Sequence, residues 1–279
     1  MSDSSGSSDR ARRTIRDFGD QWTRFDNTSG YLGSQENLAD QLRPFLAPQD
    51  LENLTIADVG AGLGRVTLQL IRAGARRVVA VEPSEAFRVL VGNVVGHEDR
   101  VSCVRAEAHE LPSENFDLLV CLGVLHHIPD PGPALRAFLD ALRPGGRALI
   151  WVYGREGNGP YLAVAHALRS VTRRLSPRVL TALTWAFYPF LRAYMALAHH
   201  LPLPLHQYSR RVLSRLTPAH IRLTIFDQLN PTWARYYRRE EIVQLVARTG
   251  FEEVQAAAKH GYSWLVSARR PTKPREAGA

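Results

Sequence analysis

Between residues 54 and 153, short apolar runs alternate with segments whose apolar positions recur at helical spacing. The predicted strands are residues 54–59, 77–81, 101–104, 116–122 and 147–153, and the predicted helices are residues 66–73, 85–95 and 133–142. Continuously apolar strands joined by helices indicate a parallel sheet that is covered on both faces. Such sheets bind ligands beyond the carboxyl ends of their strands, where the winding reverses.

The segments that flank this core have other patterns. An amphipathic N-terminal segment carries the aromatic cluster around Trp22, and a long proline-punctuated helical segment interrupts the α/β alternation before it returns with one helix and two strands. The predicted regions are a disordered tail (1–10), an N-terminal helical lid (11–50), an α/β core (51–156), a helical arginine-rich cap inserted over the sheet edge (157–238), a closing helix and strands (239–270) and a flexible tail (271–279).

Composition indicates an ordinary globular protein. The chain has 279 residues, of which 45% are hydrophobic and 22% are charged, so it is too apolar to be mainly disordered. Cys103 and Cys121 are its only cysteines, which is typical of a reducing compartment. Since we find no apolar stretch of about 18 residues and no secretory signal, we expect a cytoplasmic protein, with the inner membrane face as an alternative site of peripheral attachment.

Positive charge is concentrated in the predicted cap. The net charge is +8, yet residues 157–226 contain nine arginines and no Asp or Glu. Three interpretations stay open. The arginines can be solvated helix faces, they can hold an anionic substrate, or they can contact an anionic membrane surface around a lipid-linked substrate.

The strongest motif follows the first predicted strand. Asp58 precedes three glycines in the pattern G-x-G-x-G, at Gly60, Gly62 and Gly64. A strand that feeds into glycines lets the backbone approach a ligand closely, and the next helix offers free N–H groups. The dinucleotide fingerprint G-x-G-x-x-G would need a glycine where Arg65 stands.

Four further motifs follow the later strands. They are Val81-Glu82-Pro83, Ala106-Glu107-Ala108, the segment Phe116–Asp130 with its histidine pair, and Leu142-Arg143-Pro144-Gly145-Gly146. A carboxylate at the end of the second strand can accept hydrogen bonds from both hydroxyls of a ribose.

With these five motifs in order, the chain resembles the class I S-adenosylmethionine-dependent methyltransferases, within them the small-molecule group of ubiquinone/menaquinone type. The resemblance implies a Rossmann-like seven-stranded sheet whose last strand is antiparallel, with S-adenosyl-L-methionine as the cofactor. It also implies that Gly60 to Gly62 wrap the methionine portion, that Glu82 holds the ribose, and that the lid covers the sulfonium. The expected cofactor-binding residues are Trp22, Asp58, Gly60, Ala61, Gly62, Glu82, Pro83, Glu107, Ala108 and Leu122.

Three histidines are candidates for a catalytic base, because neutral imidazole can take a proton near pH 7. They are His127, His260 and His126, although the histidine pair can also serve positioning alone. The candidate substrate contacts are Tyr153, Asp227, Tyr237 and Tyr262, and Asp227 can instead cap a helix. We find no catechol-type set of metal ligands and expect no metal.

We therefore expect methyl transfer to a small molecule, with a hydroxyl of a glycan precursor or secondary metabolite as the first candidate, while oxygen, nitrogen and carbon acceptors all stay open. One alternative is a quinone-like or lipid-linked substrate at a membrane surface. Another is a regulatory protein that binds the cofactor without catalysis. Because the [DNS]-P-P-[YF] and Pro-Cys motifs of nucleic-acid methyltransferases are missing, the sequence argues against a nucleic-acid substrate.

Overall fold

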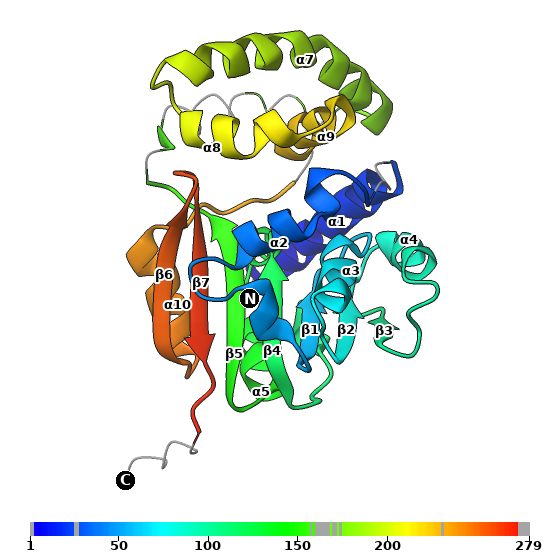
Figure 1. Ribbon diagram of the computed structural model, residues 1–279, viewed down its shortest axis with the longest axis vertical. Coiled ribbons are helices and arrows are strands. Elements are labelled where there is room, and N and C mark those ends of the chain that lie inside the picture. The colour runs from blue at the N-terminus through cyan, green and yellow to red at the C-terminus, as the bar shows by residue number, and fades with distance from the viewer. Residues whose placement is uncertain are drawn as a thin grey trace.

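A seven-stranded sheet forms the centre of the computed structural model, which describes residues 3–24, 28–156, 158–159, 168, 172, 175–229 and 232–272 (Figure 1). The strand order is β3-β2-β1-β4-β5-β7-β6. The strands are β1 (Thr55–Val59), β2 (Arg77–Val81), β3 (Val101–Val104), β4 (Phe116–Leu122), β5 (Leu142–Tyr153), β6 (Glu252–Lys259) and β7 (Ser263–Arg269). The first five are parallel, and β7 runs antiparallel to β5 and β6. The predicted sheet and its antiparallel last strand are confirmed.

Helices cover both faces of this sheet. Alternate residues of β1 enter two separate cores: Ala57 and Val59 pack with residues of α5 (Gly132–Ala141) and α10 (Arg239–Arg248), whereas Ile56 packs on the other side. That side is covered by α2 (Gln35–Leu42), α3 (Arg65–Arg72) and α4 (Ala86–Asn93). Burial on both faces explains why the strands of this sheet are almost continuously apolar.

The remaining helices lie toward the carboxyl ends of the parallel strands. They are α1 (Asp3–Arg24), α7 (Pro177–His200), α8 (His206–Arg211) and α9 (Pro218–Leu229). Figure 1 shows α7, α8 and α9 as a layer above the sheet, on the side toward which β1 and β4 point. The expected cap therefore lies over the strand ends and not over one edge of the sheet. Among the described residues, we find no helix with the length and hydropathy of a membrane span.

Two sequence expectations about element boundaries are wrong. Residues 3–10, expected in a disordered tail, are the first turns of α1. The strand expected to begin at Arg147 begins at Leu142, because Leu142 already pairs with Phe116 and the Gly145 N–H donates to the Arg270 carbonyl. Residues 273–279 of the expected C-terminal tail, and Arg169, Arg173 and Arg174 of the cap, lie outside the described residues.

Candidate active site

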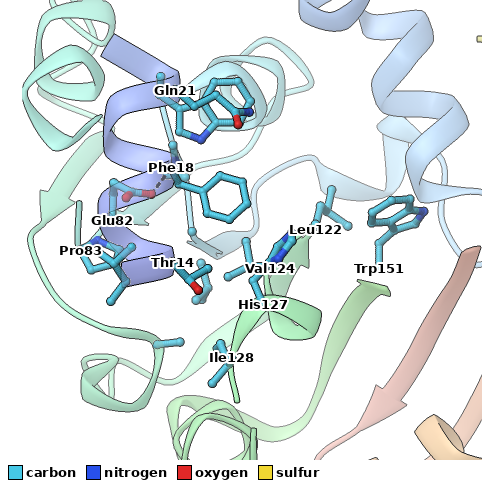
Figure 2. A pocket seen from close by; sticks show the side chains of 18 of the residues that line it. Thr14, Phe18, Gln21, Glu82, Pro83, Leu122, Val124, His127, Ile128 and Trp151 are labelled. Atoms are coloured by element: carbon cyan, nitrogen blue, oxygen red, sulfur yellow. Dashed lines mark hydrogen bonds between the residues drawn. The ribbon is translucent and has the colours of Figure 1, made fainter. Parts of the chain in front are cut away.

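One cavity of about 650 Å³ lies between the strand ends, α1 and the cap. Its first part is formed by the loops that follow β1, β2, β3 and β4, and α1 passes over these loops (Figure 2). Its second part is lined by side chains from α2, β5, α8 and α9. The cavity thus joins the predicted cofactor motifs to a chamber beneath the cap.

The turn after β1 brings backbone to the cavity wall. Gly60 has φ +75°, and a Cβ added there would lie 2.2 Å from Val124 Cγ2, so a side chain at this position would clash. The Gly60 and Ala61 N–H groups donate to the Val81 carbonyl at 2.8 and 3.0 Å. These bonds fix the glycine turn against the end of β2, beside Glu82.

The Glu82 carboxylate is buried and held in place by two backbone donors. Its Oε2 accepts a hydrogen bond from Gly62 N–H and its Oε1 from Ser84 N–H, each at 2.9 Å. Each carboxylate oxygen can accept more than one bond, so both can still receive ribose hydroxyls. A fixed acceptor pair beside a glycine turn fits the adenosyl portion of S-adenosylmethionine.

Most of the other expected cofactor residues also line the cavity, namely Trp22, Ala61, Gly62, Pro83, Glu107, Ala108 and Leu122. Asp58 does not. Its Oδ2 accepts a 2.6 Å hydrogen bond from Thr67 Oγ1 in the buried layer beneath the turn. Burial raises the pKa of Asp58 to about 7, the Thr67 bond opposes this rise, and the charge of Glu82 adds to it. Asp58 therefore supports the turn from below.

Helix α1 supplies the lid over this part of the site. Figure 2 shows Phe18 pointing into the cavity between Glu82 and His127, with Gln21 one turn along the helix. The Gln21 amide donates to Asp227 Oδ1 at 3.0 Å, which ties the lid to α9. Trp22 stacks against the Arg65 guanidinium, whose carbon lies 4.8 Å from the indole centroid.

Of the three histidine candidates, only His127 lines the cavity. Its Nδ1 lies 2.8 Å from the Trp233 carbonyl. Because a carbonyl only accepts, Nδ1 carries the hydrogen, and in the neutral ring the lone pair is on Nε2. The Phe18 ring packs edge-on against this imidazole at 4.6 Å between centroids.

The other two histidines lie elsewhere. His126 is fully buried, with its ring 4.1 Å from that of Tyr153. His260 Nε2 lies 2.7 Å from Asp40 Oδ2 on α2, and Lys259 Nζ approaches Oδ1 of the same carboxylate at 3.5 Å. Burial raises the pKa of Asp40, but the His260 bond and the Lys259 charge outweigh this, and its net pKa is lowered. His260 thus anchors α2 to the end of β6.

Three of the four candidate substrate residues line the chamber: Tyr153, Asp227 and Tyr262. The Tyr153 hydroxyl donates to Asp227 Oδ2 at 3.1 Å and accepts from Gln228 Nε2 at 3.1 Å. Burial raises the pKa of Tyr262 well above its usual value, so this phenol stays protonated. Tyr237 is fully buried and lies outside the cavity wall, and burial raises its pKa to about 12. Asn230 and Pro231, with which Asp227 could form a cap, lie outside the described residues.

Several lining residues escaped sequence reasoning, notably Gln41, Arg65, Trp151, Tyr208 and Thr224. Gln41 Oε1 is a buried acceptor with no hydrogen-bond partner among the described residues. Arg65 stands where the dinucleotide fingerprint would need a glycine. This departure from the fingerprint was the one signal in the sequence that could have pointed to Arg65. The others come from elements that meet only in the folded protein.

A family model described as "Methyltransferase domain" matches residues 57–150. Over these residues the chain is similar to methyltransferase domains. The cofactor of the protein is S-adenosyl-L-methionine, as the sequence predicted. The methyltransferase fold is also that of the apo S-adenosylmethionine-dependent methyltransferase SibL, with a TM-score of 0.51 and 17% identity over 84% of this chain and 54% of the other.

The curated relatives that this chain matches are named for tRNA and not for a small-molecule substrate. The tRNA U34 carboxymethyltransferase of Shewanella oneidensis is 34% identical over 115 residues, which are 40% of this chain and 34% of the relative. That of Chromohalobacter salexigens is 34% identical over 125 residues, 42% and 37% of the two chains. The chain thus spans about a third of the length of these relatives.

These relatives correct one expectation from the sequence. The missing motifs of known nucleic-acid methyltransferases argued against a nucleic-acid partner, and relatives that are named for tRNA contradict that argument. The motifs mark particular chemistries, amino methylation and cytosine C5 attack, so their absence does not exclude other positions of a nucleic acid. The narrower resemblance to the ubiquinone/menaquinone group is not confirmed, and the comparisons do not support peripheral membrane contact through residues 157–226.

Proposed function

We propose that this protein transfers the methyl group of S-adenosylmethionine to a small molecule that is held beneath the cap. The continuous cavity carries this proposal, because Glu82 and the glycine turn line one part and Tyr153, Asp227 and Tyr262 line the other. A hydroxyl group is the favoured acceptor, since the cavity is lined by the His127 imidazole, which can take its proton.

The residues divide into binding and proton-handling roles. The cofactor, when bound, supplies a methyl group on a sulfonium, an electrophile that needs no activation by an acid. Glu82 and the glycine turn fix its position, while Phe18 and Trp22 exclude water. His127 takes the acceptor proton at Nε2 as the new bond forms, and its Nδ1–H bond to the Trp233 carbonyl keeps the ring in that tautomer.

A nucleoside of tRNA is a second candidate substrate. The names of the curated relatives favour it, and Arg192, Arg210 and Arg211 are exposed on the cap, where they can contact phosphates. The relatives align with only about 40% of this chain, so the substrate side of the two proteins can differ.

Methyl-tritiated S-adenosylmethionine separates these candidates. The protein is incubated with the cofactor and either the small-molecule fraction of a cell lysate or purified total tRNA, and each product is counted. We expect label in the small-molecule fraction, whereas label in tRNA would favour the second candidate. The Glu82→Ala variant, which loses the ribose acceptor, serves as the matched control and should label neither. Absence of label in every fraction would contradict methyl transfer.

A further inference from the structure

A second cavity, of about 370 Å³, lies inside the cap beside the first. Its walls come mainly from α7 and α9. The residues that line both cavities are Tyr153, Tyr208, Thr224, Gln228 and Tyr262. The two spaces therefore adjoin along these residues, which include two of the candidate substrate residues, Tyr153 and Tyr262.

The lining of this second cavity is apolar and uncharged. Aromatic and aliphatic side chains such as Phe187, Leu191 and Ile225 predominate, and none of its described lining residues is Asp, Glu, Lys or Arg. Two polar ends among the shared residues engage each other, because Gln228 Nε2 donates to the Tyr153 hydroxyl. Protein interiors are close-packed, and an apolar void of about 150 Å³ already binds benzene in another protein. A charged group would lose hydration here and would find no charged partner among these described lining residues.

One polar atom stands out in this lining. Asn158 is 1% exposed, and its Nδ2 donates to the carbonyls of Gly154 and Tyr262 at 2.7 and 3.0 Å. These two bonds fix which way the amide points. Its Oδ1 has no hydrogen-bond partner among the described residues. A buried acceptor without a partner is costly, and a ligand with a single O–H or N–H donor would satisfy it.

The cavity reaches the surface beside α7. Phe190 lines it and is nevertheless 73% exposed. Pro189, inside the same helix, removes a backbone hydrogen bond next to this opening. A ligand can therefore enter from the cap surface without passing the cofactor.

We propose that this second cavity binds the hydrophobic part of the methyl acceptor, an uncharged chain or ring system with one hydrogen-bond donor for Asn158. The proposal rests on the proposed small-molecule function and specifies its substrate class. The acceptor atom would lie where the two cavities adjoin, beside Tyr153 and toward Asp227 in the first cavity. Steric fit in the cap, and not charge, then selects the substrate.

Fluorescence of N-phenyl-1-naphthylamine, a neutral aromatic amine with one N–H, tests this site. The protein is first saturated with S-adenosylhomocysteine, so that the cofactor end of the first cavity is filled. We expect one probe molecule to bind per chain, and 1-decanol to displace it at least tenfold more effectively than decanoate, because the carboxylate is charged. The N-methyl derivative of the probe, which has no donor, should bind about fivefold more weakly, as the loss of one hydrogen bond predicts.

Two variants locate the probe. Leu191→Trp fills the cavity and Phe190→Asp places a charge at its opening, and each should weaken probe binding at least tenfold. Leu197→Asp, on an exposed position of the same helix that does not line the cavity, should bind the probe like the wild type. The proposal is overturned if the wild-type complex binds no probe, or if all three variants bind it equally.

Calorimetry of S-adenosylmethionine binding and the methyl-labelling assay do not use the fluorescent probe, so they test the proposed function separately from the proposed ligand site. Methyl transfer to a small molecule without probe binding would refute only the proposed ligand site in the second cavity. Probe binding without any methyl transfer would refute the proposed function and leave a hydrophobic ligand site.

Discussion

At the scale of single residues, Glu82 is the side chain on which we propose that cofactor binding depends most directly. Backbone N–H groups hold both of its oxygens, so the carboxylate would meet a ribose without reorganising. Hydrogen bonds to charged groups contribute about 1.5–3 kcal/mol each, and we expect Glu82→Gln to weaken S-adenosylmethionine binding by roughly ten- to a hundredfold in calorimetry. Glu85→Gln, at an exposed acid that pairs with Arg105, is the control. Equal affinities for the wild type and the Glu82 variant would refute the ribose assignment.

Asp58 should make stability depend on pH. Its pKa is raised to about 7 in the folded protein from its usual value of 3.8, so folding favours the protonated form. The free energy of unfolding should therefore fall by up to about 4 kcal/mol as pH rises from about 4 to about 7, and it should stay constant above that pH. Asp58→Asn keeps an acceptor for Thr67 and removes the charge. In urea titrations, we expect the free energy of unfolding of the variant to depend less on pH than that of the wild type, and the variant to be the more stable protein at pH 8. Parallel pH dependences of the two proteins between pH 5 and pH 8 would contradict the raised pKa of Asp58.

We propose that Arg65 faces the methionine end of the bound cofactor, because its guanidinium stacks on Trp22, whose indole faces Gly62. Burial lowers its pKa to about 10, which still leaves it charged at pH 7. We expect Arg65→Gln to weaken S-adenosylmethionine binding about tenfold, since an arginine–carboxylate bond is charge-assisted. Decarboxylated S-adenosylmethionine supplies the control and should bind both proteins alike. Equal losses for the two ligands would instead assign Arg65 to the support of Trp22.

At the scale of elements, buried strands were predictable and contacts between distant elements were not. The bounds of β2, β3 and β4 match the apolar runs because both faces of each strand are covered. The polar start of α1 looked like a tail because nothing in Asp3–Arg10 reveals that the rest of the helix is anchored over the site. Gln41 and Tyr208 could not be found at all, since α2 and α8 contribute to one cavity only when the cap docks on the core.

The close contact between α1 and the loop after β2 can be tested by a substitution in α1. A Cβ at Gly19 would lie 3.1 Å from the Glu85 nitrogen and 3.3 Å from Ser84 Cβ, so Gly19→Leu should push the lid away from the Glu82 loop. Leucine favours helix over glycine by about 0.8–1 kcal/mol, and lost helicity would therefore not explain a defect. We expect S-adenosylmethionine affinity to fall about tenfold.

Gly6→Leu is the matched control for this lid variant. It lies in the same helix, where an added Cβ meets only the Arg10 side chain at 3.7 Å. Its affinity for S-adenosylmethionine should equal that of the wild type. If both leucine variants bind the cofactor normally, α1 does not hold the cofactor in place.

At the scale of the whole molecule, one hydrogen-bond chain connects lid, cap and core. Gln21 of α1 donates to Asp227 of α9, and Asp227 also accepts from Tyr153 of β5. These residues are 206 and 74 positions apart in sequence, yet all three line the same cavity. A ligand that orders one of the three parts should therefore order the others.

Hydrogen exchange with and without S-adenosylhomocysteine tests this coupling. At a ligand concentration of about 100 Kd, binding stabilises the folded state by about 2.7 kcal/mol, so amide protection can rise by up to about 100-fold. We expect slower exchange in α1 and α9 as well as at the ends of β1 and β2. Helix α10, which contributes no residue to the cavity wall, is the internal reference. Protection confined to β1 and β2 would mean that lid and cap close independently of the cofactor, because the chain through Asp227 would then carry no coupling.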